Sequence, residues 1–175
     1  VKEKSTNHFD GIVGYVPKTT NRDGYFTGFV NFSFRNLFGT ERAFSFKWEN
    51  ETSETQELEL KYYEPWLAGY PLNLELELFQ RKQDTTYVNR KYTAELEFRA
   101  SADFTASTLF EYTSTIPSDN GGVFTVYNSN TVSTGFKLMY DSRNDLYSPT
   151  SGFLLENVYL YNKKSINGPE QFIDE

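Results

Sequence analysis

The stretch of sequence that decides the fold is Pro71-Leu72-Asn73-Leu74-Glu75-Leu76-Glu77-Leu78-Phe79. Leucine occupies every second position from 72 to 78, and polar or acidic residues fill the positions between. Successive side chains of an extended strand point to opposite faces, whereas a helix would scatter these leucines around its circumference. The stretch therefore predicts a β-strand with one apolar face and one charged face.

The same period-two alternation recurs in both directions from this stretch. Turn-forming residues, mainly Gly, Pro, Asn and Asp, separate the alternating runs. We predict nine strands, at residues 9–16, 25–34, 43–50, 56–63, 72–81, 90–99, 104–113, 131–140 and 153–162. Nothing predicts a helix longer than a turn or a second domain. The expected fold is therefore all-β, an antiparallel up-and-down sheet in the single unit 1–175.

Composition and motifs argue against several functions. A formal net charge of −7 argues against a nucleic-acid partner, because phosphate binding needs clustered Lys and Arg. The absence of cysteine excludes disulfides and thiolate metal sites. No motif places a serine nucleophile or an orienting acid beside the sole histidine, His8, and no calcium-loop pattern occurs. We predict no catalytic residue, no cofactor and no metal.

Alternating strands fit two kinds of structure. A soluble barrel or sandwich turns the apolar face inward, and a membrane barrel turns it outward to lipid around a wet lumen. The mean hydropathy of −0.61 does not exclude the second, because a membrane strand needs only ~9–11 residues with every other one apolar. We favour the membrane barrel. Its predicted lipid-facing residues are Leu72, Leu74, Leu76, Leu78, Phe44, Phe46 and Trp48, and the predicted lumen-facing ones are Glu75, Glu77, Glu95 and Glu97.

The connections between the predicted strands alternate in character. Odd-numbered connections are polar, and the longest of them spans 115–130. Even-numbered connections contain Gly, Pro and aromatic residues. In a meander the two sets lie at opposite ends, and aromatic rings suit a membrane interface. We therefore predict one aromatic rim, formed by Phe38, Tyr63, Trp66, Tyr70 and Tyr147.

Several short motifs occur in order along the chain. They are Gly24-Tyr25-Phe26-Thr27-Gly28, then Arg35-Asn36-Leu37-Phe38-Gly39-Thr40, Tyr62-Tyr63-Glu64-Pro65-Trp66-Leu67, Asp84-Thr85-Thr86-Tyr87, and Tyr140-Asp141-Ser142-Arg143-Asn144-Asp145 with Pro149-Thr150-Ser151-Gly152. In this order they resemble the bacterial surface-antigen superfamily, and most closely the first half of the barrel of its BamA-type assembly factors. The resemblance marks as family turn residues Asn36, Leu37, Phe38, Gly39, Glu64, Pro65, Trp66, Asp141, Arg143, Pro149, Thr150 and Gly152.

This resemblance implies a location and a set of partners. It implies a fragment of a transmembrane barrel of about 16 strands in the bacterial outer membrane. The opening Val1-Lys2-Glu3-Lys4, with no initiator Met or signal peptide, is interpreted as an internal cut. The periplasmic repeat domains and the C-terminal half of the barrel are then absent from this sequence. The implied partners are the lipid bilayer, client outer-membrane proteins and accessory subunits.

The resemblance also implies a functional strand. Assembly factors of this family insert other barrels, and a weak seam beside the first strand offers an edge to a client strand. The predicted seam residues are Phe9, Asp10, Gly11, Ile12, Val13, Gly14, Tyr15 and Val16. Two glycines weaken this strand, and Pro17 ends it. The alternative is that the glycines only relieve crowding in the barrel wall.

Three other functions remain open at this point. The barrel could belong to a related family member with an upstream hydrolase domain, to a passive porin, or to a soluble barrel that binds an apolar ligand.

An odd number of strands leaves closure open as well, because bacterial single-chain barrels have even counts. The chain could close into a barrel of about eight strands, pair edge to edge with a second copy, or take its partner strands from a longer chain. We expect the third.

Overall fold

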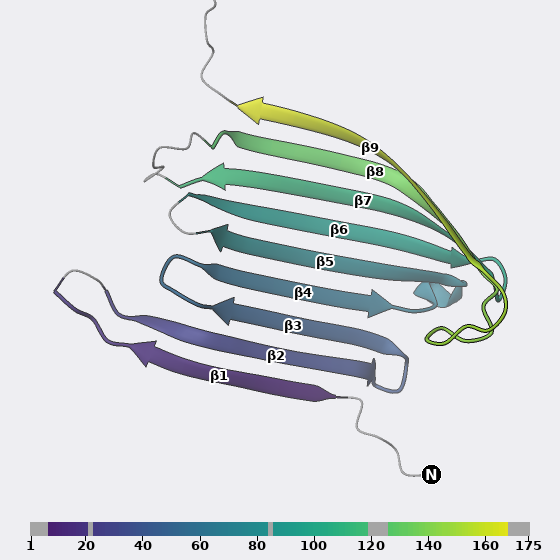
Figure 1. Cartoon of the computed structure of the whole chain (residues 1–175), viewed down its shortest axis with the longest axis horizontal. Coiled ribbons are helices and arrows are strands. Elements are labelled where there is room, and N and C mark those ends of the chain that lie inside the picture. Colours follow the sequence, from purple (N-terminus) through teal and green to yellow (C-terminus); the bar gives the residue numbers. More distant parts are fainter. Residues whose placement is uncertain (1–6, 21–22, 84–85, 119–125, 168–175) are drawn as a thin grey trace, which may run out of the picture.

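The computed structural model describes residues 7–20, 23–83, 86–118 and 126–167. These residues form one sheet of nine antiparallel strands in which every strand pairs with its neighbours in chain order (Figure 1). The strands are β1 (His8–Val16), β2 (Tyr25–Leu37), β3 (Arg42–Asn50), β4 (Gln56–Glu64), β5 (Leu72–Gln83), β6 (Tyr87–Arg99), β7 (Phe104–Pro117), β8 (Asn128–Asp141) and β9 (Leu154–Asn167). The predicted all-β meander is confirmed.

All nine predicted strands are present, but several continue past their predicted ends. β2 reaches Leu37, β7 reaches Pro117 and β9 reaches Asn167, three to five residues beyond the prediction. The added residues are mostly polar and lie outside the alternating runs that predict the strands. Main-chain pairing does not require an apolar side chain, so strands continue where the alternation has ended.

The one helix in the described part of the chain is η1 (Leu67–Gly69), a single turn between β4 and β5. No helix among the described residues is long and apolar enough to cross a membrane.

Cross-strand register gathers the apolar side chains on one face of the sheet. Phe32, Phe46, Leu60, Leu78 and Tyr92 lie opposite one another in a row across five strands, and the first two rings stack at 4.7 Å. The predicted acidic residues have the opposite parity on β5 and β6, where Glu75 pairs with Glu95 and Asn73 with Glu97. The predicted separation of apolar and acidic residues onto two faces is confirmed.

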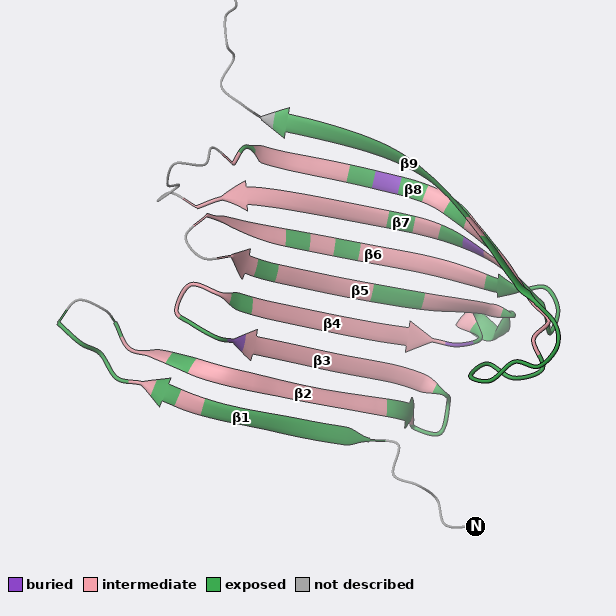
Figure 2. Ribbon diagram, in the orientation of Figure 1, coloured by how far each residue is buried: buried purple, intermediate pink, exposed green. Residues whose placement is uncertain are grey.

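Burial shows which face is concave. On β7 and β8 the apolar-face residues Phe110 and Phe136 are 50% and 46% exposed, whereas Ser107 and Ser133 on the polar face are 4% and 6% exposed. Figure 2 shows short buried segments on both strands. A curved sheet spreads side chains on its outer face and crowds those on its inner face, so the polar face is the inner one. Pro65 is buried, but no Ala, Val, Leu, Ile, Met, Phe, Tyr or Trp side chain in the described ranges is. The described sheet is a single curved layer without a closed hydrophobic core.

The sheet is open. Among the described residues β1 pairs only with β2, and β9 pairs only with β8, so the small closed barrel is not formed. The two margins lie on opposite sides of the molecule (Figure 1). Strand direction argues against closing all nine strands on themselves. The first and ninth strands of an antiparallel meander run the same way, and pairing them would introduce a parallel pair into an up-and-down barrel.

Candidate functional site

The free edge of β1 carries the predicted seam residues. All of them, Phe9 to Val16, lie on β1, whose nine residues pair with β2 along their whole length. Its other edge faces no described strand. The side chains of Phe9 and Ile12 are 74% and 69% exposed. An edge strand of this kind offers its unpaired N–H and C=O groups to another strand.

Close backbone approach explains one glycine of β1 and one of β2. Gly28 has a φ of 127°, and a Cβ there would lie 1.9 Å from the carbonyl oxygen of Ile12. A Cβ at Gly11 would lie 2.9 Å from the carbonyl oxygen of Phe29. At Gly14 the nearest atom would be a methyl group 3.5 Å away, which is an ordinary contact. Crowding therefore accounts for Gly11 but not for Gly14.

The loop end of the β1–β2 hairpin separates from the rest of the sheet. Tyr25 to Thr27 pair with β1, but pairing of β2 with β3 begins only at Gly28. Two side chains cross the gap. The Thr27 hydroxyl donates to the carbonyl oxygen of Asn50 at 2.9 Å, and the Asn50 amide donates to the carbonyl oxygen of Phe26. This link was not predictable from the sequence, because Thr and Asn at strand ends are common turn residues.

The Asn-Leu-Phe-Gly motif forms the β2–β3 turn. Asn36, Phe38 and Gly39 are all left-handed, with φ of 60°, 56° and 73°. The Gly39 N–H donates to the Asn36 carbonyl at 3.1 Å, and the Asn36 side chain accepts the Glu41 N–H at 2.9 Å. A left-handed Phe is uncommon, and here it leaves the ring of Phe38 90% exposed. The motif shapes the turn and directs an aromatic ring outward.

The Glu-Pro-Trp motif ends β4 beside an ion pair. The Glu64 carboxylate accepts bonds from the guanidinium of Arg42, at 2.7 Å from Nη2, and from the Tyr62 hydroxyl. Trp66 follows with a left-handed φ of 51°. Arg42 was not among the predicted site residues. The available signal was its parity, since it shares the face of Phe44 and is a charge on an otherwise apolar row.

The Asp-x-Arg-Asn and Pro-Thr-x-Gly motifs fold the β8–β9 connection onto itself. Arg143 donates to both carboxylate oxygens of Asp141 at 2.8 Å. The Asn144 side chain accepts the N–H groups of residues 150 and 151 at 3.0 and 3.1 Å, beyond the exposed Pro149. Gly152 has a φ of 86°, and a Cβ there would lie 2.1 Å from the carbonyl oxygen of residue 142.

An acidic side chain caps the tip of the same connection. The Asp145 carboxylate accepts the N–H of Ser148 at 2.7 Å and the N–H of Tyr147 at 2.8 Å. These two bonds, with that of Ser148 the stronger influence, lower the pKa of Asp145 below its usual value.

The loop string at 84–87 is only partly visible, because residues 84–85 lie outside the described residues. Thr86 donates its hydroxyl to the Gln83 carbonyl at 2.6 Å, and Tyr87 begins β6. Antiparallel topology places this connection at the end opposite to the other motif-bearing turns.

The predicted aromatic rim is confirmed. Phe38, Trp66, Tyr70 and Tyr147 lie in the β2–β3, β4–β5 and β8–β9 connections, and Tyr63 lies one residue before the end of β4. These connections are all at the right-hand end of the sheet in Figure 1. Phe38 and Tyr147 are 90% and 95% exposed.

Ion pairs cover the inner face, and three of the four pairs named next connect different strands. The pairs are Lys47–Glu57 at 2.8 Å, Lys61–Glu59 at 3.0 Å, Lys91–Glu77 at 3.8 Å and Lys137–Glu95 at 2.6 Å. The last pair joins β8 to β6 across β7. In the register Lys137 lies opposite Ser107 of β7. Ser107, on the strand that the ion pair spans, is buried. The sequence showed the acidic stripe but not which lysines would neutralise it.

No group of three or more His, Asp or Glu side chains in the described part of the chain is arranged to hold a metal ion.

Comparison with known proteins identifies a family. The model of the Omp85 superfamily domain matches residues 36–173, which covers the motif-bearing turns and β3 to β9 but not β1. No curated protein and no solved structure matches the chain. The matched segment is more than three quarters of the 175 residues. It contains the turns around Phe38, Trp66 and Gly152, so the chain belongs to the Omp85 superfamily.

Proposed function

We propose that this chain forms part of the barrel wall of an outer-membrane assembly factor, and that the free edge of β1 pairs with a strand of an incoming client barrel. Members of the Omp85 superfamily are outer-membrane proteins that insert or transport proteins. The single observation that supports pairing of β1 with a client strand is that β1, a nine-residue strand with two glycines, has an open edge.

The exposed apolar face supports a location in the bacterial outer membrane. No described Ala, Val, Leu, Ile, Met, Phe, Tyr or Trp side chain is buried, and rows of Phe, Leu and Tyr side chains lie on the outer face. A soluble barrel would turn that face into a closed core. The described strands are 9 to 14 residues long, and ~9–11 tilted residues cross a bilayer. An apolar face of this kind is suited to contact with lipid.

An edge in hydrocarbon supports pairing with a client. Each unsatisfied N–H or C=O group in lipid costs several kcal/mol, so the edge of β1 must be occupied by something. A client strand satisfies these groups by β-augmentation, and it dissociates when its groups pair with another strand of the client barrel. The step exchanges hydrogen bonds and needs no external energy source.

Strand direction supports a longer chain as the source of the remaining wall. Because β1 and β9 run the same way, an odd number of further strands must lie between them for every pair to be antiparallel. A second copy in the same membrane orientation would meet β9 with a β1 of the same direction, which again makes a parallel pair. We therefore propose that further strands of a longer chain complete the barrel, and that pairing with a second copy does not. In this proposal the longer chain also carries periplasmic repeat domains, and accessory subunits bind to it.

Two neighbouring proline substitutions test the role of the edge. Adjacent residues of a strand direct their N–H groups to opposite sides, so one of Ile12→Pro and Val13→Pro removes a donor used by β2 and the other removes a donor offered at the edge. The full-length protein is reconstituted in liposomes, and heat-modifiable gel mobility shows whether each variant is folded. Protease protection then measures how much of an unfolded client barrel is inserted.

We expect the variant that keeps the native mobility to lose client insertion by at least about ten-fold, because one hydrogen bond is missing and its acceptor on the client is left unsatisfied. The matched control is Phe136→Ala on the outer face of β8, which leaves the edge intact. A cysteine at position 13 and one on the client strand give an independent readout, because the natural chain has no cysteine. Unchanged insertion in both folded proline variants, with no cross-link, would refute the role of β1.

A further inference from the structure

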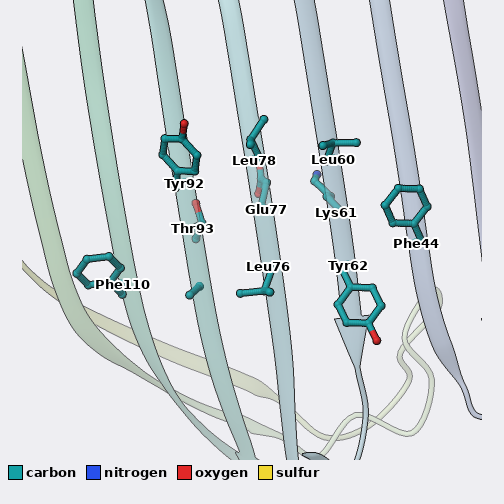
Figure 3. A pocket seen from close by; sticks show the side chains of 11 residues that line it. Phe44, Leu60, Lys61, Tyr62, Leu76, Glu77, Leu78, Tyr92, Thr93 and Phe110 are labelled. Carbon is teal, nitrogen blue, oxygen red and sulfur yellow. The ribbon is translucent and has the colours of Figure 1, made fainter.

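The outer face of the sheet is hollowed at one place. The hollow has a volume of about 390 Å³, within the ~300–1,000 Å³ range of ligand sites, and lies over β3 to β7 (Figure 3). It exists because one position in a row of large side chains is small. Tyr62, Leu76, Ala94 and Phe110 lie opposite one another on consecutive strands, and Ala94 leaves the gap.

The lining of the hollow is apolar. Phe44, Leu60, Leu78 and Tyr92 surround the gap together with the row that contains Ala94 (Figure 3). The other lining residues have the parity of the inner face by register. The only polar side-chain atoms that border the hollow from the outer face are therefore tyrosine hydroxyls. This chemistry fits a hydrocarbon chain.

A charged pair lies beside the hollow on the side of the turns. The ring of Tyr62 lines the hollow, and its hydroxyl donates to Glu64, two residues further along β4. In Figure 3 this hydroxyl points away from the gap toward the turns. Glu64 in turn binds Arg42, and both belong to the outer face at strand ends. An ion pair inside hydrocarbon is costly, so this pair belongs at the depth of the lipid headgroups.

We propose that this face binds one zwitterionic phospholipid, with an acyl chain in the hollow over Ala94 and the headgroup at the Arg42–Glu64 pair. The proposal rests on the membrane location proposed above. The pair presents one cation and one anion side by side, which matches a headgroup with one phosphate and one ammonium group. An anionic headgroup would meet Arg42 but be repelled by Glu64. The ligand is therefore of the phosphatidylethanolamine class.

Retention of lipid by the full-length protein tests the site. The protein is extracted from membranes and placed in nanodiscs with equal amounts of phosphatidylethanolamine and phosphatidylglycerol. Native mass spectrometry counts the lipid molecules that stay bound to the protein when it is released from the nanodiscs. Ala94→Phe fills the hollow, and Ala94→Leu fills it in part. The matched control is Ala106→Phe, an alanine on the same face that lies outside the hollow, opposite Phe98 and Leu138.

We expect the natural protein to retain phosphatidylethanolamine in preference to phosphatidylglycerol. Ala94→Phe should reduce its retention at least five-fold, Ala94→Leu by less, and Ala106→Phe not at all. Glu64→Gln removes the anion and should reduce the preference at least three-fold. Equal loss in Ala94→Phe and Ala106→Phe, a preference for phosphatidylglycerol, or no retained lipid would each overturn the site.

The test separates this site from the proposed function. Ala94→Phe should leave client insertion unchanged, because it lies four strands from β2 and touches no edge. Failure of the proposed function would appear as absent client insertion by the natural protein, whatever lipid it retains. Failure of the membrane location would appear as a natural protein that stays monodisperse without detergent.

Discussion

β1 and β9 are both free edges that pair along their whole length, yet they differ in length, in glycine content and in ring contacts. β1 has nine residues and two glycines, whereas β9 has fourteen residues and none. β9 pairs with β8 at every one of its positions, and its Tyr159 stacks on Phe136 at 4.8 Å. The ring contact of β1, Tyr15 with Phe26, is a tilted one at 5.2 Å. The comparison predicts that β1 is the more weakly held of the two edges.

One feature is common to the two edges and allows them to be compared directly. Each lies against a glycine of its neighbouring strand. A Cβ at Gly28 would lie 1.9 Å from the carbonyl oxygen of Ile12 on β1, and a Cβ at Gly135 would lie 1.9 Å from that of Tyr159 on β9. Only Gly28 also has a positive φ, of 127°. Alanine at these two positions perturbs one edge at a time.

The largest effect is expected from Gly28→Ala. Backbone strain costs ~1–3 kcal/mol and overpacking a further ~1–3 kcal/mol, so β1 should separate from β2 with a loss of about 3 kcal/mol. Hydrogen exchange of the reconstituted full-length protein should show faster exchange throughout His8 to Val16 and unchanged exchange in β9. Native protection in β1 would show that the hairpin absorbs the added methyl group and that β1 is not the weaker edge.

Gly135→Ala should have a smaller effect, about 1–3 kcal/mol, because it overpacks without left-handed strain. Exchange should increase in β9 and stay unchanged in β1, as measured by the same experiment. Gly39→Ala is the control for glycine removal, since a Cβ there meets nothing within 4 Å and its φ of 73° adds only local strain. A larger loss from Gly135→Ala than from Gly28→Ala would reverse the ranking of the two edges.

Lys137→Met should weaken the β9 side by about 1–2 kcal/mol. The Lys137–Glu95 pair joins β8 to β6 at 2.6 Å, and its side chains are only 25% and 20% exposed. Removal of the lysine leaves a partly buried carboxylate unpaired, a greater loss than that of a surface pair. Urea unfolding of the protein in liposomes measures this loss of stability. Adding Glu95→Gln to the Lys137→Met variant should recover part of the loss. Full additivity of the two changes would show that the pair contributes nothing.

The smallest effect concerns pH at the two hairpin loops. The pKa of Asp145 is lowered by the N–H groups of Ser148 and Tyr147, so its stabilising effect is complete above the unfolded value of ~3.9 and disappears as pH falls through the lower folded value. Amide NMR shifts of Tyr147 and Ser148 should change below about pH 4, and Asp145→Asn should abolish the change. The Lys18–Asp23 pair of the β1–β2 loop is 73% and 87% exposed, and a surface ion pair of this kind contributes little to stability.

The strands and the parity of their side chains were predictable from residues alone. Leu72 to Leu78, with acidic residues between them, fix a period of two, and a one-residue shift in register would move every leucine to the other face. The rim aromatics were predictable for the same reason, because alternating connections of a meander fall at opposite ends. The ends of β2, β7 and β9 were not, because pairing of main-chain groups continues where side-chain pattern stops.

The contacts of the candidate site required the structure. The identity of Gly28 was visible, but its closeness to Ile12 depends on where β1 lies. The links from Thr27 to Asn50 and from Lys137 to Glu95 join residues more than twenty positions apart. No local pattern specifies such partners, because the distance between them depends on the register and curvature of all the strands between.

The sequence by itself therefore determined the all-β meander, its apolar and acidic faces and its aromatic end, because each follows from period-two geometry and strand order. Tertiary structure alone decided that the polar face is concave and that the margins remain apart. It also decided that Ala94 opens a hollow beside Arg42 and Glu64. These properties depend on how the twist and register of nine strands accumulate across the sheet, and no single segment carries that sum.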